Sequence, residues 1–313
     1  MKLSIVHAPF HPTPTRTMQS NEPRYPRMSD QGKYHAQIDS RIARAMLLLE
    51  QRMADDVRME EVAQALGLSL HHFHRLFVAE TGEAPASYLR RIRLDAAALQ
   101  LQRSSQPAGS IAHTRGYNSQ AAFTRAFQSQ FGQSPLRYRR DNAPVRRAGT
   151  HGDSAFKIVV ADIGSFRLLA MRFVGLIWNI EMGWGKFQSA LPRDIEDEAS
   201  FYVGQLHNNP SLLQSTQTRY DCCVALAPGT EPAPALLKSL GMFVVETRAG
   251  PYACVENVGP AEDVPAAYDA LCNKWLPHSG YHATDDPVLE LFATAPSSQE
   301  PQLRRATLLL PIE

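Results

Sequence analysis

The sequence lacks any uninterrupted apolar run as long as a membrane-spanning helix, which needs about 18 residues. Apolar residues make up 44% of the chain and charged residues 20%, which is typical of folded, water-soluble proteins. The first 20 residues also lack the apolar core and the small-residue cleavage site of a secretory signal. We therefore expect a cytoplasmic protein with no membrane partner.

Cysteine is scarce, and the first 221 residues contain none. The four cysteines are Cys222, Cys223, Cys254 and Cys272. They are too few for a disulfide scaffold and lack the CxxC spacing of a zinc site, so we expect reduced, buried thiols. A redox sensor or alkyl acceptor at Cys222 and Cys223 stays open as an alternative, although the nearest basic residue, Arg219, is three positions away.

Lysine is missing from residues 34–147, where every basic residue is arginine. Residues 33–147 hold 17 basic and 10 acidic groups, whereas residues 148–313 hold 11 basic and 19 acidic groups. A basic region joined to an acidic one indicates a polyanion-binding module attached to a region with another partner. Arginine suits that role because its guanidinium forms paired hydrogen bonds with phosphate or guanine. Charge alone fits an ordinary solvated helical surface equally well.

Composition divides the chain into four segments. Residues 1–32 contain five prolines and no hydrophobic period, which predicts a flexible tail. Residues 33–140 show apolar residues at three- and four-residue steps and no strand pattern, which predicts an all-helical domain. Residues 141–155 are polar, with a proline and two glycines, and predict a linker. Residues 156–313 form the fourth segment.

The helical segment contains an internal repeat. Nine residues recur, at an offset of 49 positions before a turn and 50 after it, because the second turn (GYNS against GLS) holds one extra residue. The first copy consists of Ala63, Gly67, Ser69, Phe73, Arg75, Phe77, Gly82, Pro85 and Tyr88, and the second of Ala112, Gly116, Ser119, Phe123, Arg125, Phe127, Gly132, Pro135 and Tyr138. So many identities in one register exclude coincidence.

Each copy has the features of two helices joined by a tight turn. In the first copy, a short helix over residues 59–66 ends at Gly67, because glycine readily adopts the left-handed backbone that reverses the chain. Ser69 is then the N-cap of a second helix, whose buried face carries Phe73 and Phe77. This is a helix-turn-helix arrangement, in which the first residues of the second helix reach base edges in the major groove.

A long helix is predicted over residues 87–102, between the two copies. A stiff helix there could hold two recognition helices about 34 Å apart, which is one turn of duplex DNA. The fold class we predict is therefore a tandem helix-turn-helix, with two three-helix units joined by a long helix, followed by a second domain.

The segments MEEVAQALGLSLHHFHRLFVAETGEAPASYLRRIRLDAAALQL and IAHTRGYNSQAAFTRAFQSQFGQSPLRYRR resemble the DNA-binding domain of AraC-type transcription regulators, over residues 37–140. The resemblance implies recognition helices in adjacent major grooves, with RNA polymerase as a further partner of an activator. It places base contacts at His71, His74, Arg75, Gln120, Ala121, Thr124 and Arg125. Ala121 stands where the family often has a longer polar side chain, which leaves only an apolar contact there. We expect Arg139 to contact phosphate.

The histidines of the first copy also suggest a metal site. His71 and His74 lie on one helical face, but no third ligand follows at a suitable spacing. We therefore expect no metal and no cofactor.

Residues 156–313 contain eight short runs rich in β-branched and aromatic residues, interrupted by two helical patterns. The runs lie at 156–160, 168–174, 201–206, 222–226, 243–246, 252–258, 288–293 and 306–310, and the helices at 184–198 and 262–275. The order is roughly strand, helix and two strands, repeated twice. It predicts an α+β domain of two sheet-and-helix halves.

The end of this segment, AGPYACVENVGPAEDVPAAYDALCNKWLPHSGYHATDDPVLELFATAP followed by ATLLLPIE, resembles the GyrI-like effector-binding domain, to which we assign residues 156–313. The resemblance implies a small, often cationic and lipophilic molecule in an aromatic cleft, facing a strand glutamate. That glutamate is Glu290 in this sequence. Candidate walls of the cleft are Trp178, Tyr202, Tyr252, Trp275, Tyr281 and Phe292.

Glu290 is unusual in its own sequence context, because all of its near neighbours are apolar. Strand alternation places it on the same face as Val288 and Phe292. A carboxylate between apolar side chains needs a partner, and a cation over aromatic rings could supply one. A glutamate on an edge strand, facing water, is the alternative.

Together these features predict a one-component transcription regulator that binds double-stranded DNA through residues 33–140 and a small-molecule effector through residues 156–313. Two alternatives stay open. The second domain could hydrolyse an electrophilic compound, with the cleft glutamate orienting water, or it could contact only other proteins. We expect no catalytic residue, because no nucleophile is accompanied by a base and an orienting group.

Overall fold

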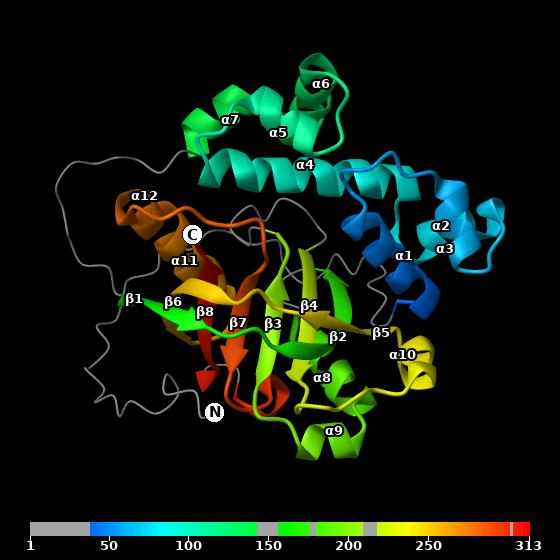
Figure 1. Cartoon of the computed structure of the whole chain (residues 1–313), viewed down its shortest axis with the longest axis vertical. Helices are drawn as coiled ribbons and strands as arrows, with labels where there is room; N and C mark the ends of the chain where they lie inside the picture. Colours follow the sequence, from blue (N-terminus) through cyan, green and yellow to red (C-terminus); the bar gives the residue numbers. More distant parts are fainter. Residues whose placement is uncertain (1–37, 143–155, 176–179, 209–217, 301–302) are drawn as a thin grey trace, which may run out of the picture. The chain divides into compact units, whose positions relative to one another are not determined.

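The computed structural model describes residues 38–142, 156–175, 180–208, 218–300 and 303–313 (Figure 1). The first range is helical, and the later ranges contain the strands. A helical N-terminal region is thus followed by a strand-rich C-terminal region, as the sequence predicts. Residues 36–313 form one compact unit. The predicted tail over residues 1–32 and nearly all of the predicted linker over residues 141–155 lie outside the described residues.

The helices of the N-terminal region follow the predicted pattern closely. They are α1 (Ser40–Gln51), α2 (Met59–Ala65), α3 (Leu70–Thr81), α4 (Pro85–Arg103), α5 (Ala108–Thr114), α6 (Gln120–Phe131) and α7 (Pro135–Asn142). Asp39 caps α1, because its side chain accepts a hydrogen bond from the backbone N–H of Arg41 at 2.8 Å. Pro85 begins α4, where its fixed backbone angle suits the first turn of a helix.

Helix α4 takes part in two hydrophobic cores. Tyr88 and Ile92 pack in one core with α1, α2 and α3. Ala97 and Leu101 pack in another with α5, α6 and α7. The first and second copies of the repeat therefore each have a core of their own, and the 19 residues of α4 connect them.

The strands of the C-terminal region form one antiparallel sheet. They are β1 (Ile158–Ile163), β2 (Arg167–Gly175), β3 (Tyr202–Leu206), β4 (Thr218–Ala225), β5 (Met242–Glu246), β6 (Gly250–Val258), β7 (Val288–Phe292) and β8 (Arg305–Pro311). Their order across the sheet is β1-β6-β8-β7-β3-β4-β2-β5. Each of the eight predicted runs overlaps one strand of the described sheet.

The two faces of the sheet carry different hydrophobic cores. On one face, Tyr220, Val288 and Phe292 pack against the helices. On the other, Cys223, Tyr252 and Leu289 belong to a second cluster. Adjacent residues of one strand point to opposite faces, so β4 contributes to both cores.

The helices over the first face differ in detail from the predicted ones. They are α8 (Ile180–Ala190), α9 (Arg193–Asp197), α11 (Val264–Asp269), a π-helical segment (Ala270–Trp275) and α12 (Leu276–Ser279); α10 (Pro234–Leu240) precedes β5. The predicted helix over 184–198 begins earlier, at Ile180, and is divided at Pro192, because proline lacks the N–H that a continuous helix requires.

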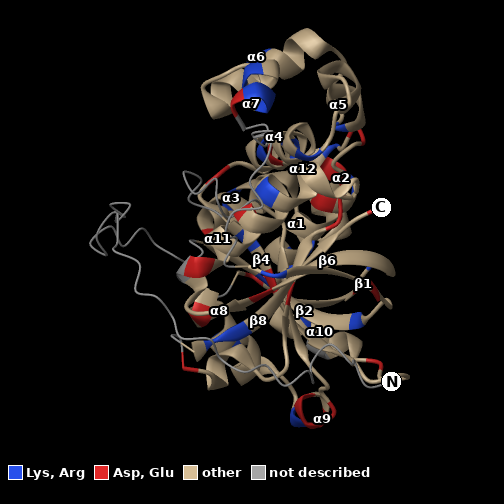
Figure 2. Cartoon of the chain, turned by 90° about the vertical axis from the view of Figure 1, so that its left-hand side faces the viewer, with Lys and Arg blue, Asp and Glu red and all other residues tan. Residues whose placement is uncertain are grey.

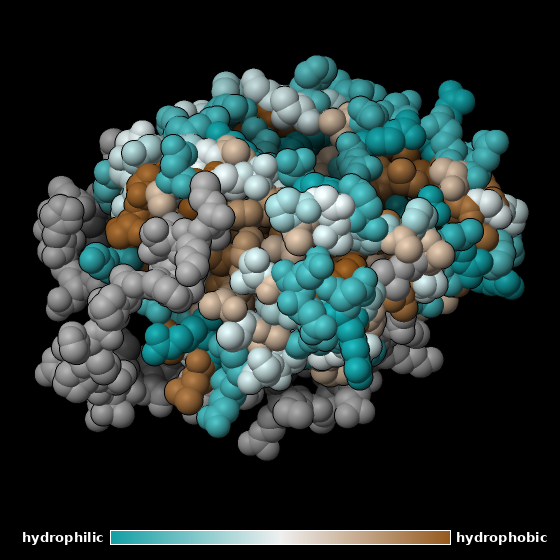
Figure 3. Space-filling model, turned by 60° about the horizontal axis from the view of Figure 1, so that its bottom comes forward, coloured by the Kyte–Doolittle hydropathy of each residue, from teal (hydrophilic) through white to brown (hydrophobic). Residues whose placement is uncertain are grey.

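The surface of the described residues is mixed in character. Acidic residues are concentrated on α9, which contains Asp194, Glu196 and Asp197, and basic ones on α7, which contains Arg137, Arg139 and Arg140, in keeping with the uneven charge of the sequence (Figure 2). On the face shown in Figure 3, hydrophobic residues lie in small groups among hydrophilic ones. No helix in the described part of the chain is long and apolar enough to cross a membrane.

Candidate functional site

The two copies of the repeat are built alike around their aromatic residues. In the first copy, the ring centroids of Phe73 and Phe77 lie 5.6 Å apart, and those of Phe77 and Tyr88 lie 5.4 Å apart. In the second copy, the equivalent distances are 5.5 Å and 5.2 Å, for Phe123, Phe127 and Tyr138. All these rings meet edge to face, the arrangement that aromatic pairs prefer. Each copy therefore fixes its second helix rigidly.

The ends of α3 and α6 are also equivalent. Ser69 accepts a hydrogen bond from the backbone of His72 at 3.3 Å, and Ser119 accepts one from Ala122 at 3.2 Å. Gly82 and Gly132 end these helices with φ of 75° and 70°, which is the left-handed conformation that glycine tolerates best. The capping that the sequence predicts therefore occurs in both copies.

The predicted DNA-contacting residues lie near the N-terminal ends of α3 and α6. Six of the side chains are exposed, namely His71, His74, Arg75, Gln120, Ala121 and Arg125, and Thr124 is half-buried. Exposure at the start of a capped helix is what groove binding requires. Groups of three or more metal-ligating side chains do not occur among the described residues.

Arg139 has a different environment from the one we expected. Its side chain is half-buried and donates hydrogen bonds to the backbone carbonyls of Leu101, at 3.2 Å, and Gln106. The Leu101 carbonyl lies in the last turn of α4, where carbonyls have no partner within the helix, and Gln106 follows the end of that helix. The geometry favours a structural tie between α4 and α7 over the predicted phosphate contact, since two of the guanidinium nitrogens are already engaged.

Glu290 lies in the middle of the sheet, with only 1% of its surface exposed, so it is not an edge-strand residue facing water. One carboxylate oxygen accepts a hydrogen bond from the Tyr220 hydroxyl at 2.7 Å. The other accepts one from Arg304 at 2.8 Å. Burial and the neighbouring Glu290 charge raise the pKa of Tyr220 well above its usual value, so the phenol remains a proton donor. The cation that Glu290 requires is thus a side chain of the same protein.

A glycine makes this hydrogen bond possible. Gly204 pairs with Glu290 across β3 and β7, and with Cys222 across β3 and β4. A Cβ atom at position 204 would overlap the Tyr220 hydroxyl group. The phenol therefore passes over the backbone of β3, where only glycine leaves room for it.

Trp184 of α8 is the centre of the aromatic cluster near Glu290. Its ring centroid lies 6.1 Å from that of Tyr220, 5.5 Å from that of Phe292 and 6.4 Å from that of Tyr202. The indole is fully buried, yet its Nε1 has no hydrogen-bond partner among the described residues. Sequence reasoning missed Trp184, because one aromatic residue in a helical pattern does not differ from ordinary core.

The structure brings only some of the predicted cleft walls together. Tyr202 and Phe292 contact Trp184 on the Glu290 face. Tyr252 lies in the cluster on the opposite face, so its expected position beside Glu290 was wrong. Trp275 and Tyr281 stack on each other, with centroids 6.0 Å apart. Trp178 lies outside the described residues.

A second glutamate, whose side chain is only 10% exposed, joins the helical region to the sheet. Glu50 of α1 accepts a hydrogen bond from Tyr88 of α4 at 2.5 Å. It also pairs with Arg172 of β2 at 2.6 Å and with Arg219 of β4 at 3.1 Å. Arg172 is further bound by Asp221, which lies opposite it on β4. We call Glu50, Tyr88, Arg172, Arg219 and Asp221 the Glu50 cluster.

Electrostatics keep both acids of this cluster ionised. Burial opposes the ionisation of Glu50, but the charges of Arg172 and Arg219 outweigh it and lower the pKa of Glu50. Burial likewise opposes the charge of Asp221, and Arg172 followed by His207 lowers its pKa to about 2. Oppositely charged groups are thus matched inside this contact, and local sequence patterns could not predict such a pairing.

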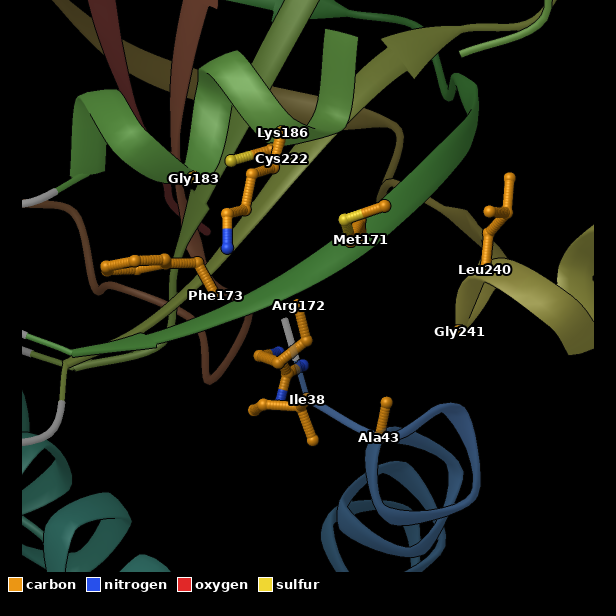
Figure 4. A pocket seen from close by; sticks show the side chains of 10 residues that line it. All are labelled: Ile38, Ala43, Met171, Arg172, Phe173, Gly183, Lys186, Cys222, Leu240 and Gly241. Carbon is orange, nitrogen blue, oxygen red and sulfur yellow. The ribbon is translucent and has the colours of Figure 1, made fainter. Parts of the chain in front are cut away.

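Further contacts join the same two regions. Arg103, at the end of α4, hydrogen-bonds the Tyr268 hydroxyl and lies 5.7 Å from its ring centroid. Arg115 pairs with Asp285 at 2.8 Å. Between Ile38 of the helical region and Met171 of β2 lies a cavity of about 20 Å³ (Figure 4), which accommodates about one water molecule and is too small for an organic effector.

The cysteines have the properties of core residues. All four are free and buried. Burial raises the pKa of the Cys222 and Cys223 thiols well above the usual value, and that of Cys254 to about 11. A reactive thiol needs a lowered pKa and access, so the redox alternative is not favoured.

Known families cover most of the described chain. Residues 62–141 match a helix-turn-helix domain family, and residues 157–313 match a GyrI-like small molecule binding domain family. The second match spans half of the chain.

Similar proteins include several regulators. The right origin-binding protein of Escherichia coli K12 is 38% identical over 95 residues, which are 30% of this chain and 33% of that protein. The transcriptional regulator Rob of Salmonella typhimurium is 37% identical over 97 residues, or 31% and 34% of the two chains. The chain therefore matches about a third of the length of these relatives. The DNA-binding domain of AdpA, solved with a target DNA, is 27% identical with a TM-score of 0.33, covering 34% of this chain and 97% of that one.

Proposed function

This chain belongs to the GyrI-like small-molecule-binding family through residues 157–313, and we propose that it is an AraC-type transcription regulator in which this region senses an effector. The observation that carries the proposal is the pair of matching helix units. Each ends in a rigid, capped helix with exposed polar side chains at its start. Residues 33–140 form the DNA-binding domain and residues 156–313 the effector-binding domain, with a linker between them.

In this proposal α3 and α6 are the two recognition helices of a tandem helix-turn-helix. Arg75 and Arg125 occupy equivalent positions in the repeat and read bases in neighbouring major grooves. His71, His74, Gln120, Ala121 and Thr124 complete the two contact surfaces. A connecting helix with a core at each end favours a fixed spacing between them.

The effector-binding domain consists of two related halves. Read outward from the centre of the sheet, β3, β4, β2 and β5 on one side correspond to β7, β8, β6 and β1 on the other. In chain order, β2, α8, β3 and β4 form one strand, helix and two strands, and β6, α11, β7 and β8 form the other, with β5 and β1 at the outer edges of the sheet. This order supports the predicted halves. Glu290, Tyr202 and Phe292 form the ligand-facing set, to which we add Trp184.

Binding without catalysis is part of the proposal, as is activation through RNA polymerase. Several of the similar proteins are named as transcription regulators or activators, which supports the first point. Both carboxylate oxygens of Glu290 are already engaged, by Tyr220 and Arg304. A carboxylate held in this way is poorly placed to orient a water molecule for hydrolysis.

Selection of duplexes from a random pool by the full chain tests the DNA-binding role. We expect recovery of one asymmetric sequence with two half-sites. Replacing Arg75 or Arg125 by Ala should cost about 1–3 kcal/mol on that sequence and relax preference at one half only. Arg44→Ala, on the exposed side of α1, is the control and should leave the preference unchanged. Equal losses on selected and random DNA would reject base reading by α3 and α6.

A further inference from the structure

The place that a cationic effector would take beside Glu290 is filled by Arg304. The guanidinium binds Glu290 at 2.8 Å through one terminal nitrogen. It also lies 4.8 Å from the centre of the Phe292 ring, which is cation–π distance. Only 3% of Arg304 is exposed. A carboxylate and an aromatic face are the two elements that recognise a lipophilic cation, and here both are engaged internally.

Arg304 is also held by a second acid, nearer the surface. Its other terminal nitrogen lies 3.3 Å from Glu181 at the start of α8. The Glu181 side chain is 34% exposed, whereas that of Glu290 is 1% exposed. The Nε of Arg304 is buried and has no hydrogen-bond partner among the described residues. The guanidinium is therefore attached to two acids at different depths, and its bonding at the deeper position is incomplete.

We propose that Arg304 is a resident cation, which a cationic effector displaces from Glu290 and which then remains paired with Glu181. This inference rests on the proposed effector role of the C-terminal region. It adds that the site exchanges one cation for another, so that the buried charge of Glu290 stays neutralised throughout. No bond is made or broken in the exchange, and no proton needs to be released.

The exchange sets a requirement on the ligand. A tethered guanidinium competes at an effective concentration on the order of millimolar, without losing translational freedom. A small hydrated cation makes no contact with Glu290 that the Arg304 guanidinium does not already make, so it does not displace the arginine. A cation with an aromatic or aliphatic body gains the contact area of Trp184 and Phe292 as well. The resident arginine thus selects ligands that are both charged and apolar.

Calorimetric titration of the full chain tests this exchange. The probes are benzyltrimethylammonium and neopentylbenzene, its uncharged carbon analogue. We expect Arg304→Met, which keeps an unbranched side chain but removes the charge, to bind the cation at least tenfold more tightly than the wild type. Binding of the uncharged probe should change less than threefold. The affinity of Arg304→Lys for the cation should lie between those of the wild type and Arg304→Met. This variant replaces Arg304→Met in the test if the latter does not fold.

Glu181→Gln provides a second measurement. It removes the surface acid, so it should weaken cation binding about tenfold in the wild-type background and have no effect together with Arg304→Met. Equal cation affinity of the wild type and the Arg304 variants would overturn the exchange while leaving ligand binding intact. If neither probe binds any variant, both the exchange and the proposed effector site are overturned. Loss of binding for both probes in Arg304→Met would show that Arg304 only supports the fold.

Discussion

Glu50 and Glu290 are both largely shielded from solvent, and each is bound by a tyrosine hydroxyl and by arginine, yet they differ in the number of charges around them. Glu50 has two arginines, and one of these is bound in turn by Asp221. Glu290 has one arginine, which is shared with a half-exposed acid. The first arrangement is redundant and holds two regions of the chain together. The second is held by a single cation and is suited to exchange.

The strongest way to test this comparison is to remove the charge of Glu50. In Glu50→Gln, Asp221 is the one acid of the Glu50 cluster that remains to balance the charges of Arg172 and Arg219. We expect the free energy of unfolding to fall by about 3–5 kcal/mol, as for other broken buried ion pairs. Denaturant unfolding measures this. The control is Glu61→Gln, in an exposed pair with Arg52, which should cost less than about 1 kcal/mol. Equal losses of unfolding free energy in Glu50→Gln and Glu61→Gln would show that the Glu50 cluster contributes little to holding the two regions together.

Gly204→Ala should produce the next largest effect, on the Glu290 side. The added methyl group overlaps the rigid end of the Tyr220 ring, which must move and lose its bond to Glu290. We expect a loss near the upper end of the range of about 1–3 kcal/mol for overpacking. Gly185→Ala is the matched control, because a Cβ there meets no atom within 4 Å and the residue lies in α8. A small gain in stability is expected for the control.

Acid should weaken the Glu50 cluster, because its carboxylates lose their charge at low pH. The folded pKa of Asp221 is lowered to about 2, and that of Glu50 is lowered as well. A lowered pKa contributes stability above the unfolded value of about 4, and this contribution is lost as the pH falls toward the folded value. We expect a loss of about 2–3 kcal/mol from Asp221 between pH 4 and about 2. In Asp221→Asn the loss of unfolding free energy between pH 4 and about 2 should disappear. If the variant loses as much stability over this range as the wild type, Asp221 is not the source of the loss.

Glu290→Gln should have the smallest effect on stability of the four changes. Arg304 loses its deeper partner but keeps Glu181, and the amide can still accept a hydrogen bond from Tyr220. We expect a loss of about 2 kcal/mol, the scale of one hydrogen bond to a charged group. Thermal unfolding of the two glutamine variants side by side measures the comparison directly. A larger loss for Glu290→Gln than for Glu50→Gln would reverse the distinction between a redundant contact and an exchangeable one.

The sequence was sufficient for the elements but not for their contacts. Periodicity and capping located α3, α6 and all eight strands, because these signals are local. Glu290 was found because an acid within an apolar strand is conspicuous. Arg304 and Gly204 were not found, since their roles depend on which strands are neighbours in the sheet. The Glu50 cluster was missed for the same reason, because its members lie far apart in the sequence.

Strand β4 carries a consequence for the register of the sheet. Tyr220 faces Glu290, while Arg219 and Asp221, on the other face, belong to the Glu50 cluster. If β4 were to slip by one residue against its neighbours, every side chain of the strand would turn to the other face. Asp221 would then face Glu290, and two carboxylates would meet where a phenol now donates a hydrogen bond. The register of β4 is therefore specified from both sides of the sheet, and a slip of one residue would disrupt the Glu290 site and the contact with the helices in a single step.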